Sequence, residues 1–506
     1  MIDFKTQKFA VIGIGDTGLS IINYLHSQNA QIVSICDTRD NPPQLGAVKA
    51  TLKTLDNNQN WIPDRVRDDE VPLYLGKLNY SQLSIADIIV ISPGVSIYDE
   101  ALQTALRHNK QVIGDIELFA HAIRDWNSKI IGVTGSNGKT TVTALTGFLL
   151  EKLSQNTLVA GNIGIPVLTS YLDILKSGAI PEAIVLELSS FQLETLYSLH
   201  FDAATVLNIS EDHLDRYRDL LEYAYAKSNI FNHCRVQVLN RDDPLTVAMA
   251  RGGKLVLWFG AGDDNKFTLK KQSVSLYHKI DPGLRRDDDS AVWDDSSVVR
   301  DDDKPGDVGV LHLQVGQQTL IPVSELQLVG THNYFNVLAS LALLDAIGID
   351  VSQDAIRQGL REFAGLEHRM QKVLEHDGVL YIEDSKGTNV GAVVAGISGL
   401  DRPVHLILGG DGKGQDFVPL RALVMNKCKS VALIGQDKEL IADVLAGISI
   451  PVEKFATLES AVTFCMKNAR AGDCVALSPA CASWDMFTNY KERAQVFRDS
   501  VYANIK

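Results

Sequence analysis

Short apolar runs separated by amphipathic stretches recur along the chain and predict strands that alternate with helices. Between about Phe9 and Gly114 these runs are KFAVIGIG, QIVSICD and ADIIVIS. A second series opens with KIIGVTG and continues through AIVLELSS, ATVLNIS, RVQVLN and KLVLWFG. It closes with an apolar-periodic segment, from about His332 to Ile347, that predicts a buried helix.

A third series begins near Leu366 and contains the runs VLYIEDS, HLILGG, SVALIG and CVALS, each followed by a helical pattern. Strands that alternate with helices form mostly parallel, doubly wound sheets, whose ligands lie at the carboxyl ends of the strands. We therefore predict an α/β protein with three domains, at residues 1–114, 115–365 and 366–506. The first and third are expected to be Rossmann-like.

Two charged segments interrupt this order, residues 62–70 and residues 281–307. The second contains ten Asp against Arg285, Arg286, Arg300 and Lys304. Such charge runs cannot be buried, so we interpret both segments as solvated insertions that are dispensable for activity. The alternative is an ordered charged loop.

Length, charge and cysteine content narrow the class of protein. At 506 residues the chain is too long for a single hydrophobic core, so several domains are expected. Its net charge of −14 argues against a nucleic-acid partner. The six cysteines form no C-x-x-C pair and are typical of reduced thiols. We see no signal peptide and no apolar run long enough to span a bilayer. A cytoplasmic location without membrane insertion is expected.

A glycine-rich loop, GVTGSNGKTT from Gly132 to Thr141, stands between a predicted strand and a predicted helix. Backbone N–H groups of such a loop bind phosphate oxygens, with the helix N-terminus behind them. Lys139 is placed to reach the β- and γ-phosphates and the Thr140 hydroxyl to bind Mg²⁺. The strict motif has glycine where this chain has Val133, so the loop is a variant, and an ordinary glycine-rich turn is the alternative. We predict that the central domain is a P-loop domain that binds ATP.

The first domain opens with a second glycine loop, Gly13 to Gly18, and Asp37 ends its next strand. This pattern is a dinucleotide fingerprint with Asp37 on a ribose, but Arg39 beside it also suits a diphosphate. The choice between NAD and another phosphate-bearing nucleotide stays open at this stage. Ser92-Pro93-Gly94 ends a third strand, where either a ligand contact or a simple turn is expected.

Carboxylates and a histidine follow two strands of the central domain. Glu187 lies inside the apolar run AIVLELSS, where an unpaired carboxylate is costly, so it is either a Mg²⁺ ligand or half of a buried ion pair. NISEDHLDR, residues 208–216, follows another strand and contains His213. A lone histidine is usually structural, but this one is predicted at the same sheet edge as the P-loop, which favours a metal ligand.

Three loops at strand ends characterise the third domain: DSKGTN at residues 384–389, GGDGKG at 409–414 and SPACAS at 478–483. Lysines in glycine-rich strand ends, here Lys386 and Lys413, are typical of anion sites for a phosphate or a carboxylate. The third loop precedes a predicted helix, whose free N–H groups also suit a carboxylate.

Motifs from all three domains occur in one order: TGSNGKTT, ELSSFQLE, NISEDHLDRY, YAKSN, HNYFN, HRM, DSKGTN, GGDGKGQDF and LSPACASWDMF. Together they resemble the Mur ligases over nearly the whole chain apart from the two charged segments. The nearest branch is the one that joins D-glutamate to UDP-N-acetylmuramoyl-L-alanine. The resemblance implies that the first domain binds a UDP-sugar rather than NAD, the second ATP and the third the incoming amino acid.

The resemblance also implies roles for single residues. Those at ATP and Mg²⁺ are Gly135, Asn137, Gly138, Lys139, Thr140, Thr141, Glu187, Asn333, Asn336, Arg369 and Asp384. His213 corresponds to the ligand of a second Mg²⁺, and Lys227 to a lysine carried as a carbamate, an anionic oxygen ligand that Mg²⁺ prefers. Taken without the resemblance, Lys227 is a surface residue of an amphipathic helix.

The substrate residues follow in the same way. Those at the UDP-sugar are Asp16, Thr17, Asp37, Thr38, Arg39, Ser92, Gly94 and Asn162. Those at D-glutamate are Lys386, Thr388, Lys413, Ser483 and Tyr490. Gly387, Trp484 and Tyr490 depart from the family, which usually has alanine, leucine and phenylalanine there.

The implied reaction is ATP-dependent amide formation through an acyl-phosphate, carried out on small-molecule substrates by a monomer. One alternative is another amide ligase of this architecture, adding a different amino acid or adding glutamates to a folate. A second is an NAD-dependent oxidoreductase built on Gly13 to Gly18, although it leaves the lysine loops unexplained. A third is a nucleotide-gated interaction protein without turnover.

Overall fold

The computed structural model describes residues 2–56, 71–213, 216–262, 264–275, 298–300, 307–328 and 330–505. Residues 62–70 lie outside these ranges, as does most of the 281–307 segment. Within the latter, Val298–Arg300 forms strand β13 and Asp307 begins β14. The interpretation of both segments as dispensable insertions stays a prediction.

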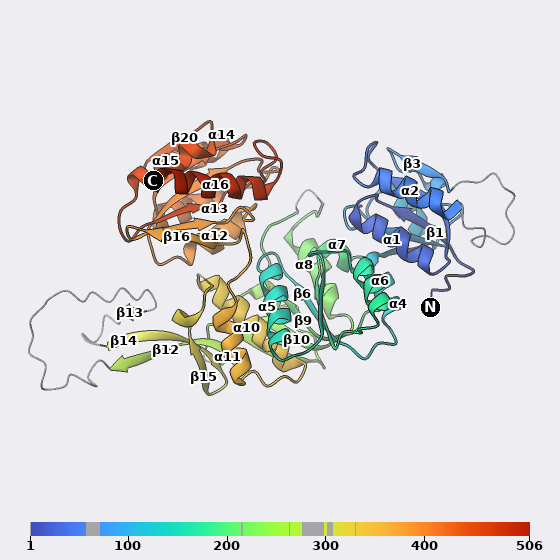
Figure 1. The fold of residues 1–506 in the computed structure, drawn as a ribbon, viewed down its shortest axis with the longest axis horizontal. Helices are drawn as coiled ribbons and strands as arrows, with labels where there is room; N and C mark the ends of the chain where they lie inside the picture. Colours follow the sequence, from blue (N-terminus) through green and yellow to red (C-terminus); the bar gives the residue numbers. More distant parts are fainter. Residues whose placement is uncertain are drawn as a thin grey trace, which may run out of the picture.

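Three sheets follow one another along the chain, as the α/β pattern predicted, and Figure 1 shows them from blue at the N-terminus to red at the C-terminus. The first sheet is parallel throughout, in the order β3-β2-β1-β4-β5. Its elements are β1 (Lys8–Ile12), α1 (Asp16–Ser27), β2 (Gln31–Asp37), α2 (Leu45–Asp56), β3 (Leu73–Leu75), β4 (Ile88–Ile91), α3 (Glu100–Arg107) and β5 (Gln111–Gly114).

The central sheet has ten strands, with the path β13-β14-β12-β11-β10-β9-β6-β8-β7 and β15 beside β14. Its strands are β6 (Lys129–Thr134), β7 (Thr157–Gly161), β8 (Ala183–Glu187), β9 (Phe201–Val206), β10 (Cys234–Asn240), β11 (Leu255–Gly260), β12 (Phe267–Ser275), β13, β14 (Asp307–Val315) and β15 (Gln318–Pro322). The strands from β6 to β12 pair in parallel, whereas β13, β14 and β15 add antiparallel pairs. The sequence pattern did not predict this antiparallel extension.

Helices cover the central sheet on both faces. They are α4 (Asp115–Ala122), α5 (Lys139–Lys152), α6 (Val167–Ser177), α7 (Ser190–Leu193), α8 (Leu220–Ser228), α9 (Pro244–Val247), α10 (Thr331–Ala346) and α11 (Asp354–Glu362). The helix predicted at His332 to Ile347 is confirmed as α10, and it is apolar all round because it is buried between α5 and the sheet.

The third sheet has the order β16-β17-β21-β18-β19-β20, parallel except for the β16–β17 pair. Its elements are β16 (Gln371–His376), β17 (Val379–Glu383), α12 (Val390–Ser398), β18 (Val404–Gly409), α13 (Val418–Lys427), β19 (Cys428–Ile434), α14 (Lys438–Val444), β20 (Val452–Lys454), α15 (Leu458–Asn468), β21 (Cys474–Leu477) and α16 (Tyr490–Ile505). The domain boundaries at 114/115 and 365/366 stay predictions.

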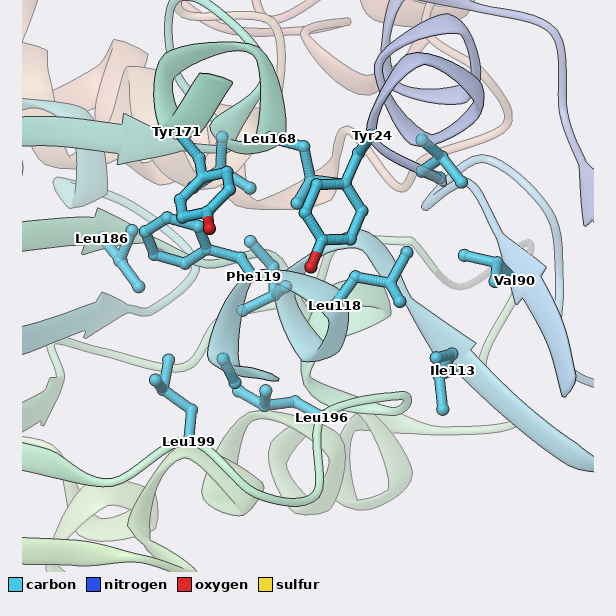
Figure 2. Packing of buried hydrophobic residues seen from close by; sticks show 14 of the residues in the cluster. Tyr24, Val90, Ile113, Leu118, Phe119, Leu168, Tyr171, Leu186, Leu196 and Leu199 are labelled. Atoms are coloured by element: carbon cyan, nitrogen blue, oxygen red, sulfur yellow. The ribbon is translucent and has the colours of Figure 1, made fainter. Parts of the chain in front are cut away.

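The first two sheets share one hydrophobic core, whereas the third has cores of its own. Figure 2 shows Tyr24 of α1, Phe119 of α4 and Tyr171 of α6 packed together, with Leu186 of β8 close by. The centres of the Tyr24 and Tyr171 rings are 5.7 Å apart, with the two rings edge to face. Burial of this apolar surface holds the first domain on the central one. Of the helices described, none combines the length and the apolar character needed to cross a membrane.

Candidate active site

The P-loop predicted from GSNGKTT is present between β6 and α5. Gly138 precedes the helix with φ of +84°, a left-handed conformation that favours glycine, and a Cβ there would lie 2.4 Å from Oδ1 of Asn336. Nζ of Lys139 donates to the carbonyls of Gly135 and Ser136, both at 2.9 Å. Desolvation lowers the pKa of Lys139, and Glu187 and Asp212 partly offset this. The lysine head thus lies against the loop and lines the larger of the two cavities described below.

Residues at the end of β9 hold this loop in shape. The Ser136 and Asn137 amides donate to the carbonyl and to Oδ1 of Asn208, at 2.9 and 2.8 Å. Nδ2 of Asn208 donates back to the carbonyl of Asn137, and Nδ2 of Asn137 donates to Oγ of Ser210. The sequence motifs did not point to Asn208, although its place just past the end of β9, the strand adjacent to β6, is a usable signal.

Glu187 ends β8 and is buried. Its Oε1 accepts a 3.0 Å hydrogen bond from Nδ2 of Asn162, while Oε2 is buried without a hydrogen-bond partner. Across the ranges that the structure describes, no cationic side chain forms a salt bridge with this carboxylate, so the buried ion pair considered from sequence is not supported. An unpartnered buried carboxylate oxygen of a residue that lines the same cavity as Thr140 fits a hard cation such as Mg²⁺.

Lys227 is buried, with 1% of its surface exposed, so its pattern-based description as a surface lysine is wrong. Helix α8 packs this side chain inward, where Nζ lies 3.5 Å from Oγ1 of Thr134 and 4.5 Å from the centre of the Tyr223 ring. Burial, and to a smaller extent Lys139, hold the pKa of Lys227 well below its usual value, against the opposing effect of Asp212 and Glu187. Burial of this kind disfavours the ammonium form of the lysine and favours the neutral amine, which is the nucleophilic form.

His213 follows β9 with φ of +56°, and its ring lies 4.8 Å from that of Phe191. Its Nε2 is 3.8 Å from Asp212, and 45% of its side chain is exposed. Over the residues described, no group of three or more His, Cys, Asp or Glu side chains gathers into a metal-binding cluster. Asp212, but not His213, lines the cavity around Lys139.

Two adjoining cavities lie between the central and C-terminal domains. One, of about 310 Å³, is lined by Asn137, Gly138, Thr141, Asn333, Asn336, Arg369 and Asp384 among others. The other, of about 590 Å³, is lined by Lys139, Thr140, Asn162, Glu187, Arg369, Lys386, Thr388 and Tyr490 among others. The structure therefore brings together most residues expected at the nucleotide and several expected at the amino acid.

Arg369 joins the two domains at these cavities, because its Nη2 donates to Oγ1 of Thr140 at 2.9 Å. Asp384 lies beneath it and accepts from Ser478 Oγ at 2.6 Å and from the Met370 amide at 3.1 Å. Burial raises the pKa of Asp384 to about 7. Asn336 donates to Asn333 at 3.1 Å on α10.

The side chains expected at the amino acid surround the C-terminal strand ends. Nζ of Lys386 lies 3.3 Å from the Tyr490 hydroxyl and 4.4 Å from the centre of its ring. Nζ of Lys413 lies 5.3 Å from the ring centre of the exposed Trp484. Lys413 and the buried Ser483 line neither cavity.

Of the residues expected at the UDP-sugar, those of the first domain lie at the carboxyl edge of the first sheet, apart from both cavities, whereas Asn162 belongs to the central domain and lines the larger cavity. Asp37 accepts from the Ile14 amide at 2.5 Å and from Nη2 of Arg39 at 2.8 Å. Burial raises the pKa of Asp37, but these hydrogen bonds outweigh it and hold the pKa below its usual range. Ser92 Oγ donates to the Gly13 carbonyl, and Asp16 accepts from Gln44. Thr38 and Gly94 are exposed, and Thr17 is half-buried.

Comparison with known proteins agrees with this geometry. Family models match residues 7–114 (Mur ligase MurD-like, N-terminal domain), 133–344 (Mur ligase middle domain) and 368–481 (Mur ligase, glutamate ligase domain). A UDP-N-acetylmuramoylalanine–D-glutamate ligase of Methylobacillus flagellatus is 42% identical over 99% of this chain and 98% of that relative. The chain belongs to the Mur ligase family. A second relative with the same name, from Chromobacterium violaceum, is 41% identical over the same shares.

Solved Mur ligases show the same fold at low sequence identity. MurF ligase of Thermotoga maritima in complex with ADP aligns over 100% of both chains with a TM-score of 0.58 and 15% identity. UDP-N-acetylmuramate–alanine ligase of the same organism aligns with a TM-score of 0.54 and 15% identity, over 99% of this chain and 100% of its own. As a Mur ligase, the chain is an ATP-dependent enzyme that forms an amide bond. The oxidoreductase alternative is therefore wrong, because residues 7–114 match a MurD-like domain.

Proposed function

We propose that this Mur ligase joins D-glutamate to UDP-N-acetylmuramoyl-L-alanine in peptidoglycan precursor synthesis. The chain matches relatives of that name at 40–42% identity over 96–99% of its length. The observation that carries the proposal is the pairing of the P-loop with Lys386 and Tyr490 around one cavity. A phosphate-binding loop on one wall fits the activation of a carboxylate by ATP. The ammonium of Lys386 on the opposite wall fits the binding of the carboxylate of an incoming amino acid.

The first domain is proposed to bind the UDP-sugar through Asp16, Thr17, Asp37, Thr38, Arg39, Ser92 and Gly94, with Asn162 from the central domain. ATP is assigned to Gly135, Asn137, Gly138, Lys139, Thr140 and Thr141, with Asn333, Asn336, Arg369 and Asp384. D-glutamate is assigned to Lys386, Thr388, Lys413, Ser483 and Tyr490. The assignment of ATP has the most direct support, because most of its residues line the two adjoining cavities.

Thr140, Glu187, His213 and a carbamylated Lys227 are proposed to hold two Mg²⁺ ions. When bound, these ions neutralise charge on the phosphate oxygens. The unpartnered Oε2 of Glu187 and the lowered pKa of Lys227 support this set, since an uncharged amine adds to CO₂ and releases one proton. His213 does not line the cavity that contains Glu187 and Thr140, so its approach to a metal there requires a change from the present geometry.

In the proposed reaction, the alanyl carboxylate of the UDP-sugar attacks the γ-phosphorus of ATP, and ADP leaves. Lys139, now hydrogen-bonded to loop carbonyls, would turn to the transferring phosphate and stabilise its charge. The amine of D-glutamate then attacks the acyl-phosphate, loses a proton and expels phosphate. Closure of the C-terminal domain, in which Arg369 already reaches Thr140, would exclude water from the intermediate.

The deciding experiment supplies the protein with ATP, UDP-N-acetylmuramoyl-L-alanine and single amino acids, and measures phosphate release. We expect phosphate release that depends on D-glutamate. Phosphate release only with a different amino acid would favour the alternative of another amide ligase of this architecture. Lys139→Ala should abolish turnover while the UDP-sugar still binds, because that site lies in another domain. The alternative of a nucleotide-gated interaction protein without turnover does not fit a chain that belongs to the Mur ligase family. A monomeric state and a cytoplasmic location stay predictions.

A further inference from the structure

Arg216 connects the first domain to the central domain at the edge where both carry their ligand loops. Its Nη1 donates to the Pro93 carbonyl at 3.0 Å, and its Nη2 donates to the Val95 carbonyl at 3.2 Å. Nη2 also pairs with Oε2 of Glu194 at 3.0 Å. Only 9% of the Arg216 side chain and 7% of the Glu194 side chain are exposed, so this is a buried, charge-assisted contact.

On the central-domain side, the contact reaches the phosphate-transfer loops through aromatic rings. The guanidinium carbon of Arg216 lies 3.7 Å from the centre of the Phe191 ring. Two aromatic rings also lie near that ring, His213 at 4.8 Å between ring centres and Tyr217 stacked at 6.0 Å. The Arg216 amide also donates to the His213 carbonyl. The position of Arg216 therefore constrains the segment that contains His213.

On the other side, the contact reaches the first glycine loop. The two carbonyls belong to the turn after β4, in which Ser92 Oγ donates to the Gly13 carbonyl. A Cβ on Gly13 would lie 2.7 Å from that of Ser92, so the two loops pack closely. A shift of the turn is thus transmitted to the first glycine loop.

We propose that Arg216 is a positioning residue that aligns the UDP-sugar site with the phosphate-transfer site. Arginine suits this task, since its planar fork holds two carbonyls and a carboxylate at once, which an ammonium cannot do in one geometry. The shared apolar core keeps the two domains together, while Arg216 sets the register of the loops at their ligand edge. The inference rests on the proposed function, because only a substrate that spans the two domains needs this alignment.

The first test measures kcat and KM in Arg216→Lys and in the double variant Arg216→Met/Glu194→Gln, which leaves no unpaired buried charge. Binding of UDP-N-acetylmuramoyl-L-alanine and of ADP is measured separately by calorimetry. Misplacement of reacting groups by about 1 Å costs on the order of 100-fold in rate. We expect kcat to fall by roughly that factor in the double variant, with both affinities within about threefold of the wild type. The kcat of Arg216→Lys should lie between those of the wild type and of the double variant.

Arg107→Met is the matched control, because Arg107 is exposed on α3, where its guanidinium donates to Oγ1 of Thr104 on the same helix. It should leave kcat unchanged. A double variant that folds, as judged by its thermal midpoint and circular dichroism, and turns over at the wild-type rate would overturn the inference. So would a loss confined to UDP-sugar affinity, which would make Arg216 a binding residue. A wild-type protein without D-glutamate-dependent phosphate release would instead remove the proposed function.

Discussion

Lys227 shows how a single side chain can differ from its local pattern. Helix α8 contains exposed Leu221 and Tyr225, while Lys227 is buried beside Thr134 of the P-loop strand. A buried, unpaired ammonium is costly, and loss of its proton or conversion to a carbamate relieves that cost. The geometry is therefore more consistent with a modified or uncharged lysine than with an ordinary one.

The Lys227→Ala variant is expected to lose at least about 100-fold in kcat, the scale of a removed electrostatic group. Short-chain carboxylates should restore part of the rate, because they supply the missing anionic oxygen. Phosphate release with and without added acetate or propionate measures this. The control is Lys254→Ala, which removes a lysine bound to backbone carbonyls far from the P-loop and should show no rescue. Full activity in unrescued Lys227→Ala would exclude the carbamate.

Tyr490 stands where phenylalanine is usual and hydrogen-bonds to Lys386. Tyr490→Phe keeps the ring under the ammonium but removes the hydroxyl, a loss of about 1 kcal/mol for a typical hydrogen bond. KM for D-glutamate should therefore rise about fivefold, while KM for ATP stays constant. Steady-state kinetics of this variant and of Tyr502→Phe, on the exposed side of α16, provide the comparison. An unchanged KM would show that the hydroxyl plays no part in amino-acid binding.

At the scale of elements, the strand–loop–helix unit of β6 and α5 is the most determined part of the site. The apolar strand, the glycines and the helix start all agree with one another, so local sequence specifies the loop. The loop's exact shape nevertheless depends on Asn208 after β9 and Asn336 on α10, which are distant in sequence.

Gly138→Ala tests this dependence. Alanine costs about 1–2 kcal/mol in the left-handed conformation, and its Cβ would also displace Asn336. The Kd for ATP, measured by calorimetry, should rise at least about tenfold. Gly178→Ala is the matched control, with φ of +72° at the end of α6 and nothing within 4 Å of its Cβ. That variant should lose some stability and keep its ATP affinity, and equal affinities in both variants would contradict the argument.

At the scale of the whole molecule, the first two domains behave as one packed unit. Their common core includes α4, the helix between the two sheets, where the buried Asp115 has one carboxylate oxygen without a hydrogen-bond partner. Glu117 of the same helix accepts from the Tyr197 and Ser198 amides. These contacts do not extend to the third sheet, which meets the central domain mainly around the two cavities.

Burial raises the pKa of Asp115 from 3.8 to about 6. The folded state therefore binds the proton of Asp115 more tightly than the unfolded state does. The stability that the protonated carboxyl contributes is fully present below pH 3.8 and is lost as the pH rises through about 6. Asp115→Asn should match the wild type near pH 4 and exceed it at pH 7 by up to about 3 kcal/mol. Urea denaturation of both proteins across this range checks it, with the exposed Asp125→Asn as control. Parallel pH profiles of the Asp115 variant and the wild type would contradict the assignment.

The sequence by itself determined the α/β class, the strands β1, β6, β8 and β17, the helix α10 and the phosphate loop at Lys139. Each depends on a short-range pattern of apolar residues and glycines. The motifs in the sequence also indicated the Mur ligase family. Only the tertiary structure decided that Lys227 is buried, that Oε2 of Glu187 is buried without a hydrogen-bond partner and that Arg216 joins two domains. Those facts depend on which distant surfaces pack together, and no local periodicity encodes which residue from another part of the sequence will lie against a given side chain.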